Sequence, residues 1–267
     1  MCIYVYTMKG CIMKDIIAVI NQKGGVGKST TVLSLGKALA VKGFKVLFID
    51  LDAQHNLSYT MKIKDTSTLD ITSLELLIGK VKAINAIQHT KQGDIIASSP
   101  SLALADSIII ETGKEYRLKK ALAEIQSNYD YILIDTPPAL GILTVNALTA
   151  CTGVIIPAQA DIYSLQGISQ LYKTISAVKE YCNPALQVMG ILLTRYNPRT
   201  IISRDVADMI ENTAMQFQTK LYKTKIRECT AIKESQIKQT DIFDYAQNSN
   251  AAIDYTSLAN EIIKEKK

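Results

Sequence analysis

The feature that most constrains the fold is a glycine-rich segment, QKGGVGKST, at residues 22–30. A largely apolar run, Ile16 to Asn21, precedes it and predicts a strand, and Thr31 to Val41 follows with the period of a helix. Glycines in such a loop let successive backbone N–H groups point at phosphate oxygens, and the N-terminus of the following helix adds partial positive charge. This order of elements therefore predicts a phosphate-binding loop in an α/β fold.

Short apolar runs alternate with stretches of helical period along the rest of the chain. Strands are predicted at 16–21, 45–50, 94–97, 130–135, 154–159, 187–194 and 222–226. Helices are predicted at 29–42, 114–127, 141–150, 164–181, 201–217 and 251–265. Residues 61–91 predict short helices, with Thr72 or Ser73 as an N-terminal cap. The fold class is therefore α/β, a mostly parallel, doubly wound sheet flanked by helices.

The domain organisation follows from the absence of a linker rich in Pro, Gly or Ser. The sequence predicts one domain over residues 15–267 and an N-terminal extension, interpreted as disordered, over residues 1–14. Five cysteines without a C-x-x-C pair argue against a disulfide framework and against zinc or iron–sulfur sites. The apolar runs are shorter than a membrane-spanning helix needs, and no secretory signal is evident, so a cytoplasmic location is expected.

The glycine loop predicts ATP and Mg²⁺ as ligands. Lys28 would reach the β- and γ-phosphates, and the Ser29 hydroxyl would bind Mg²⁺, which takes up negative charge as the terminal phosphate bond breaks. The predicted nucleotide contacts of the loop are Gly24, Gly25, Val26, Gly27, Lys28, Ser29 and Thr30.

Carboxylates follow two of the predicted strands. Asp50 and Asp52 end the second strand, and Asp135 ends the apolar run YILID before the turn TPP. Parallel strands point their carboxyl ends toward the ligand crevice, so these acids are expected beside the glycine loop. The predicted metal site consists of Ser29, Asp50 and Asp135, because carboxylates and hydroxyls are oxygen ligands that suit Mg²⁺.

The loop departs from the common pattern G-x-x-x-x-G-K-[ST], because Gln22 stands where the first glycine belongs and Lys23 follows. It matches the deviant Walker A motif K-G-G-x-G-K-[ST], and in this it resembles the ParA family of partition proteins, which includes the Soj type. The resemblance implies that Lys23 acts in catalysis by reaching the nucleotide of a second subunit. It also implies that Asp52, in the DLDAQHNLS run that resembles DxDPQGN, positions the attacking water. Ala53 and His55 depart from that run, which puts the turnover rate in question.

The resemblance extends from about Asp15 to the end of the chain and implies further contacts. Thr194, Arg195 and Arg227 would lie near the adenine. Arg199 would grip DNA without sequence preference, but a second arginine of the relatives is Ala231 here. Other basic residues would then meet DNA phosphates. The expected DNA-binding residues are Arg199, Arg204, Lys223, Arg227, Lys233 and Lys238.

The implied function is that of an ATP-dependent DNA-partition ATPase with slow basal turnover. The protein would dimerise with ATP, bind double-stranded DNA non-specifically, and leave it when a ParB-like centromere-binding partner stimulates hydrolysis. It would be cytoplasmic and associated with the nucleoid. The net charge of +5 and the excess of basic residues between 195 and 240 suit this function, although a solvated helix surface would give the same excess.

Two alternatives stay open. A MinD-like, membrane-cycling ATPase has the same fold, but the closing run SLANEIIKEKK has few bulky apolar residues, so no stable membrane association is expected. A DNA-binding autoregulator could use ATP as a ligand rather than a fuel. Some ParA-like proteins carry a separate N-terminal helix-turn-helix domain for that purpose, whereas about fifteen residues precede the first strand here, so specific repression is the weaker expectation.

Overall fold

The computed structural model describes residues 15–63 and 69–265, so the predicted extension over 1–14 lies outside the described residues. Seven strands form one sheet in the order β3-β4-β2-β5-β1-β6-β7. The strands are β1 (Asp15–Val19), β2 (Val46–Asp50), β3 (Ile87–Thr90), β4 (Gly93–Ile96), β5 (Tyr131–Asp135), β6 (Gly153–Gln159) and β7 (Gln187–Thr194). All neighbours pair in parallel except β3 and β4. The predicted α/β class is confirmed.

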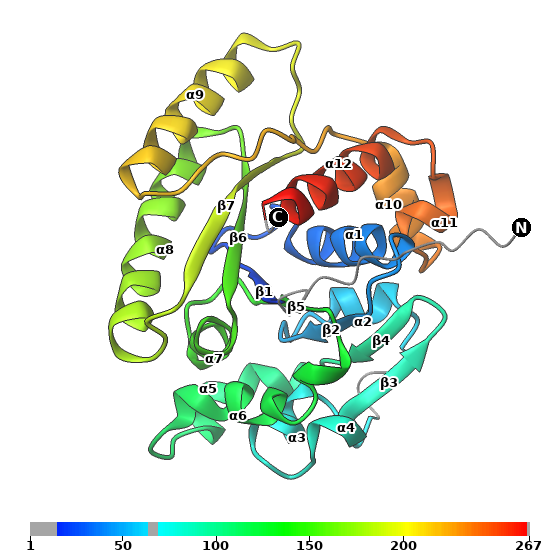
Figure 1. The fold of residues 1–267 in the computed structure, drawn as a ribbon, viewed down its shortest axis with the longest axis vertical. Helices are drawn as coiled ribbons and strands as arrows, with labels where there is room; N and C mark the ends of the chain where they lie inside the picture. Colours follow the sequence, from blue (N-terminus) through cyan, green and yellow to red (C-terminus); the bar gives the residue numbers. More distant parts are fainter. Residues whose placement is uncertain (1–14, 64–68, 266–267) are drawn as a thin grey trace, which may run out of the picture.

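Helices cover both faces of the sheet, as Figure 1 shows. One face carries α1 (Lys28–Val41), α2 (Asn56–Thr60) and α12 (Asn250–Lys264), with α10 (Thr230–Ile237) and α11 (Ile242–Ala246) beside them. The other face carries α3 (Ser73–Leu77), α6 (Arg117–Ala123), α7 (Ile142–Ala150), α8 (Ile162–Tyr181) and α9 (Ile201–Gln216). Shorter helices are α4 (Ala83–Ala86), α5 (Ala105–Ile108) and three 3-10 turns at Pro100–Leu104, Lys114–Tyr116 and Gln126–Asn128.

The apolar core has two halves because side chains alternate across each strand. In β1, Ile17 and Val19 pack in the half that includes the α1 residue Leu35. Ile16 and Ala18 point to the opposite half. The strands are buried on both faces, which is why they read as continuous apolar runs in the sequence.

Most predicted helices agree with the structure to within a few residues. The predicted cap of the first short helix is confirmed: the Thr72 hydroxyl accepts a hydrogen bond from the Leu74 N–H, and Glu75 accepts one from the Thr72 N–H. This is a capping box. The helix predicted at 114–127 is instead α6 flanked by two 3-10 turns.

The strand predicted at 222–226 was wrong. The structure has isolated bridges to β7 and its extension at Leu221 and Arg227, and the N–H groups of Tyr222 and Ile226 donate to β7 carbonyls without forming a continuous ladder. The physical reason is a competing acceptor on α12, since Glu261 accepts hydrogen bonds from the N–H groups of Lys223 and Thr224 and from the Thr224 hydroxyl. These N–H groups are therefore not available for a strand ladder.

A strand was missed at Ile87–Thr90, inside the segment predicted as short helices. It forms the antiparallel edge of the sheet with β4 through a tight turn at Lys91 and Gln92. Gly93 closes the turn with φ of 126°, a backbone conformation that other residues rarely adopt. The four residues of β3 are partly buried or exposed, and apolar and polar residues do not alternate cleanly along them. The sequence pattern for a strand was therefore weak.

Strand register places the predicted site residues together. Asp135 lies opposite Val19 of β1 on one side and opposite Asp50 of β2 on the other. The glycine loop after β1, the acids after β2 and Asp135 of β5 therefore share one edge of the sheet, where ligands bind in folds of this kind.

Candidate nucleotide site

The glycine loop has the backbone conformation that a phosphate site requires. Gly25 and Gly27 have φ of 74° and 86°, and Gly27 caps α1. The loop is anchored by Asn21, whose side-chain amide donates to the Pro157 carbonyl at 2.6 Å and whose oxygen accepts from the Lys23 N–H at 2.9 Å. A Cβ added at Gly24 or Gly25 would meet no atom within 4 Å, which leaves an open cradle in front of the helix. This arrangement fits a phosphate group.

Lys28 folds back over the loop instead of pointing into solvent. It is largely buried, and its Nζ donates to the Lys23 carbonyl at 3.5 Å. Burial lowers the pKa of Lys28, while the charges of Asp135 and Asp52 raise it in part. The ammonium therefore sits between the loop and the acids, where it can meet phosphate oxygens.

Asp135 is fully buried, and neither carboxylate oxygen accepts a hydrogen bond at normal distance from the described residues. Burial and the nearby Asp50 raise its pKa well above the ordinary value, and Ser29 and Lys28 oppose that rise. An unpaired buried carboxylate is costly unless a cation or donor accompanies it. The orphaned Asp135 beside the Ser29 hydroxyl therefore fits the predicted Mg²⁺. The described residues contain no group of three or more His, Cys, Asp or Glu arranged to hold a metal, so phosphates or water would have to complete the shell.

Asp50 differs from Asp135 because its oxygens already have donors. Oδ1 accepts from the Asp52 N–H at 3.0 Å, and Oδ2 accepts from the N–H and hydroxyl of Ser58 at 2.9 and 2.8 Å. Burial raises the pKa of Asp50 to about 6, although these hydrogen bonds lower it. The role of Asp50 as a metal ligand stays a prediction, and this geometry does not favour it.

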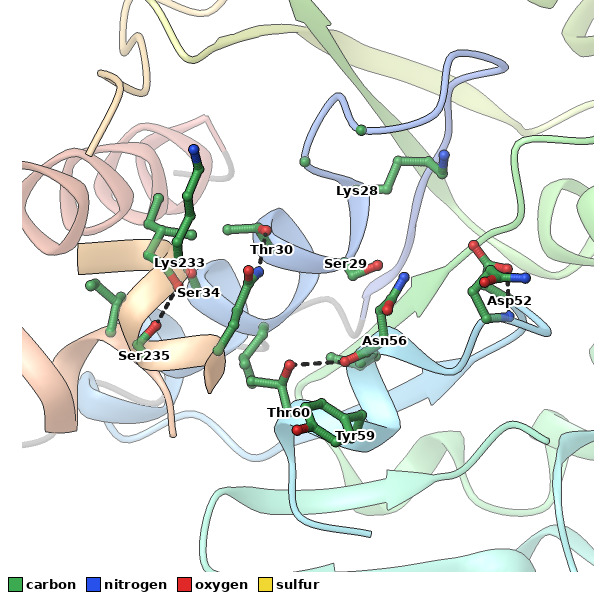
Figure 2. A pocket seen from close by; sticks show the side chains of 18 of the residues that line it. Lys28, Ser29, Thr30, Ser34, Asp52, Asn56, Tyr59, Thr60, Lys233 and Ser235 are labelled. Carbon is green, nitrogen blue, oxygen red and sulfur yellow. Dashed lines mark hydrogen bonds between the residues drawn. The ribbon is translucent and has the colours of Figure 1, made fainter. Parts of the chain in front are cut away.

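Asp52 lies on the open side of the site. Its Oδ1 accepts from the Gln54 N–H at 3.0 Å, and the carboxylate faces the same opening as Lys28, Ser29 and Asn56 (Figure 2). His55, which stands where the resembling run has glycine, adopts the left-handed conformation with φ of 45°. The tight turn is therefore kept without glycine, although the left-handed conformation costs a residue with a Cβ about 1–2 kcal/mol.

A groove of about 730 Å³ runs from the glycine loop between α1, α2 and α10. We call it the nucleotide groove. Gln236 of α10 donates a hydrogen bond to the Thr30 hydroxyl at 3.1 Å, so α10 lies against the start of α1 (Figure 2). Lining residues that the sequence did not single out include Asn56, Tyr59, Thr60 and Gln236. Only Asn56 had a signal, since it stands in the DLDAQHNLS run; α10 carries no motif that places it here.

The residues predicted at the adenine do not line the nucleotide groove. Thr194 is buried against the glycine loop, where its hydroxyl donates to the Val26 carbonyl at 2.8 Å. Arg195 pairs with Glu228 at 3.0 Å on the surface. Their adenine contacts stay predictions. Lys233, predicted for DNA, does line the groove.

Lys23 is held by its own chain. Its Nζ lies 2.5 Å from Asp161 Oδ2 and 3.5 Å from the Gln159 side-chain oxygen. Asp161 also caps α8 by accepting from the Ser164 N–H at 3.0 Å. The pKa of Asp161 is lowered: burial raises it, but the hydrogen bonds and charge of Lys23 and the Ser164 N–H outweigh that effect. Lys23 therefore lies at the rim of the site in an intramolecular ion pair.

The residues predicted to bind DNA lie on separate elements. Arg199 and Arg204 are exposed at the start of α9, and Lys233 and Lys238 are exposed on and just after α10. Lys223 is exposed in the segment before α10. Arg227 is half-buried in a pair with Asp254, with Nη2 to Oδ1 at 2.6 Å.

Comparison with known proteins identifies the family. A family model described as an AAA domain matches residues 14–188. The sporulation initiation inhibitor protein Soj of Bacillus subtilis is 39% identical over 94% of this chain and 98% of its own. The chain belongs to the ParA/Soj family of partition ATPases. The chromosome partitioning protein ParA of Caulobacter vibrioides is 35% identical over 94% of this chain and 95% of its own.

A solved structure agrees with this ParA-type assignment in fold and ligands. Cobyrinic acid a,c-diamide synthase from Mycobacterium smegmatis, with bound ADP and magnesium, superposes with a TM-score of 0.82 at 34% identity over 95% of each chain. The predicted P-loop fold is thereby confirmed, and the resemblance to the ParA family is confirmed by the Soj and ParA relatives. No helix of the described ranges is long and apolar enough to cross a membrane.

Proposed function

We propose that this ParA-type chain is a Mg²⁺-dependent ATPase that dimerises with ATP, binds double-stranded DNA non-specifically, and is released when a ParB-like partner stimulates hydrolysis. The observation that carries the proposal is the open glycine cradle beside the orphaned Asp135 in a chain 39% identical to Soj. Binding of ADP and magnesium by a relative of 34% identity supports the choice of ligands.

The chain's own residues supply most of the chemistry. Backbone N–H groups of the loop and the start of α1 bind the phosphates, and Lys28 offsets the charge that develops between them. Asp52 faces the opening and accepts a proton or orients water. Mg²⁺, held by Ser29 and Asp135 when bound, neutralises phosphate charge.

The position of Lys23 and the exposed basic residues support the proposed dimerisation and DNA binding. A lysine at the rim of the site can reach a neighbouring nucleotide once it leaves Asp161. Two copies would double the number of exposed cations, including Arg199 and Arg204, that meet the same DNA. Binding to phosphates rises steeply with the number of such contacts and falls with salt.

A direct test is DNA binding without nucleotide, with ADP, and with ATP plus Mg²⁺. We expect binding only with ATP, a fall with added salt, and loss in the Lys23→Ala and Arg199→Ala variants. Lys179→Ala, which removes the same charge from the exposed end of α8, serves as the matched control. ATP-driven binding to anionic vesicles but not to DNA would refute the proposal and favour the MinD-like alternative. ATP-independent, sequence-specific binding would favour the autoregulator.

A second candidate comes from the solved relative named as a diamide synthase. Turnover of ATP that depends on a corrinoid acid and a nitrogen donor, with no response to DNA, would support this candidate against the partition function.

A further inference from the structure

Four buried groups form a closed ring of hydrogen bonds that includes both backbone polar groups of Asp52. The members come from the end of β2, from α2, and from the segment that follows β4: Asp50, Asp52, Ser58 and Ser98. We call this set the Asp52 ring. Asp50, Ser58 and Ser98 are completely buried, and Asp52 is 9% exposed at the edge of the nucleotide groove.

The first half of the ring runs through Asp50. The Asp52 N–H donates to Asp50 Oδ1 at 3.0 Å, and the Ser58 hydroxyl donates to Asp50 Oδ2 at 2.8 Å. The Ser58 N–H adds a second bond to the same oxygen at 2.9 Å. Hydrogen bonds to an ionised carboxylate are stronger than those between neutral groups, so this half binds α2 firmly to the end of β2.

The second half returns through Ser98. The Ser98 N–H donates to the Ser58 hydroxyl oxygen at 3.0 Å, and the Ser98 hydroxyl donates to the Asp52 carbonyl at 2.6 Å. The N–H and C=O of Asp52 are therefore both bound inside the ring. On the side chain of Asp52, Oδ1 accepts a hydrogen bond from the Gln54 N–H at 3.0 Å.

The loop after Asp52 is a tight turn closed by its own hydrogen bonds, since the His55 N–H donates to the Asp52 carbonyl at 2.8 Å and the Gln54 N–H donates to Asp52 Oδ1 at 3.0 Å. Ala53 stands where the resembling run has proline, so no pyrrolidine ring restricts the backbone angle φ there. His55 adopts the left-handed backbone conformation although it is not glycine. These local bonds close the turn, and the Asp52 ring fixes its position relative to three separate segments of the chain.

We propose that Ser58 and Ser98 are positioning residues for hydrolysis, which hold the Asp52 backbone so that its carboxylate meets the reacting water. Asp50 completes the ring and acts through Ser58 rather than on a metal. This inference rests on the proposed function, in which Asp52 orients water. A displacement of about 1 Å at a reacting group can cost roughly 100-fold in rate, so loss of either hydroxyl should reduce turnover.

The test compares Ser58→Ala and Ser98→Ala with Ser73→Ala. Ser73 is the matched control because it is equally buried and its hydroxyl donates to the Asp50 carbonyl at 2.8 Å, outside the ring. We expect kcat for ATP to fall about 10- to 100-fold in the two ring variants, with KM and ATP affinity within about 3-fold of wild type. Ser73→Ala should keep kcat within about 3-fold. Ser58→Thr, which keeps the hydroxyl, should restore most of the rate.

The outcomes separate this inference from the proposed function. Should the wild-type protein hydrolyse no ATP, the proposed function and the ring's role fail together. Should the wild type hydrolyse ATP and Asp52→Ala abolish it while both ring variants keep full kcat, only the positioning role is wrong. If kcat of Ser73→Ala falls as much as kcat of the ring variants, the loss reflects general structural damage and the positioning role is also wrong. Where an alanine variant does not fold, Ser58→Cys and Ser98→Cys fill the space with a weak donor and give the same reading.

Discussion

At the scale of single residues, the site contains more negative charge than the unliganded protein can stabilise. Asp135 is buried, and no group in the described part of the chain donates to its carboxylate at normal hydrogen-bond distance; Asp50 is buried beside it in the neighbouring strand. Lys28 is the cation that faces both Asp135 and Asp52. Ligands that bring positive charge or hydrogen-bond donors relieve this cost, so stability and function oppose each other here.

The pH dependence of stability follows from these carboxyl groups. The pKa of Asp50 is raised to about 6, and that of Asp135 is raised in the same direction. The native state therefore holds more protons than the unfolded state above about pH 4, where unfolded Asp ionises, so stability is lost as pH rises through about 6. We expect the free energy of unfolding without ligand to fall by about 1 kcal/mol or more between pH 5 and 7.5. Urea unfolding at several pH values, with a chelator present to remove metal ions, measures this free energy of unfolding.

The control is Asp135→Asn, which removes the buried negative charge and keeps nearly the same side-chain shape. It should raise the free energy of unfolding at pH 7.5 by about 1–3 kcal/mol, reduce the pH dependence, and abolish Mg²⁺-dependent ATP binding. A free energy of unfolding that rises from pH 5 to 7.5 would contradict the assignment of the raised pKa values.

At the scale of elements, the packing of α1 on the sheet depends on Gly36. A Cβ at this position would lie 2.2 Å from Phe48 Cε1 and 3.0 Å from Leu133 Cδ1. Glycine normally weakens a helix interior, so its presence here reflects close approach of α1 to β2 and β5. The approach brings the start of α1 to the edge where Asp135 ends β5.

Gly36→Ala should therefore destabilise the protein although alanine is the better helix former. Propensity favours alanine by up to about 1 kcal/mol, but overpacking costs about 1–3 kcal/mol or more because both neighbours are buried. Gly167→Ala in α8 is the matched control, since its nearest atom is 3.8 Å away, and it should be neutral or stabilising. Thermal unfolding of both variants measures the difference. A more stable Gly36→Ala would mean that α1 shifts without cost.

At the scale of the whole molecule, the ion pair between Lys23 and Asp161 competes with the proposed dimer. Both side chains are about one third exposed, so solvent screens the pair and limits it to about 1 kcal/mol or less. A dimer in which Lys23 reaches the partner's nucleotide must first break this pair. Breaking the pair therefore opposes dimerisation by about 1 kcal/mol or less in each subunit.

Because the Lys23 side chains of both subunits leave Asp161 in such a dimer, Asp161→Asn should strengthen ATP-dependent dimerisation by up to about 30-fold. Asparagine retains the cap of α8, because it is as good an N-cap as aspartate. Asp244→Asn, the same change on an exposed face of α11, is the control. Sedimentation with a non-hydrolysable ATP analogue measures the dimer dissociation constant. An unchanged or weaker dimer in Asp161→Asn would show that Lys23 is not restrained by this pair.

What the sequence by itself determined is local and periodic. Three features could be predicted because each depends on residues close together in the chain. Glycine marks the positive φ of the loop, a carboxylate after an apolar run marks the end of a strand, and apolar runs that alternate with helical periods mark the buried strands. The cap at Thr72 could be predicted for the same reason, since its partner Glu75 is three residues away.

Contacts between distant segments were decided only by the tertiary structure. The sequence gives no sign that Glu261 would take the N–H groups of a predicted strand, that Gln236 would meet Thr30, or that Ser98 would bind the Asp52 carbonyl. Each partner lies more than thirty residues away, and a single serine or glutamine has no periodic signature. Strand order and helix packing bring these groups together, which is why the folded chain alone shows how Asp52 is held.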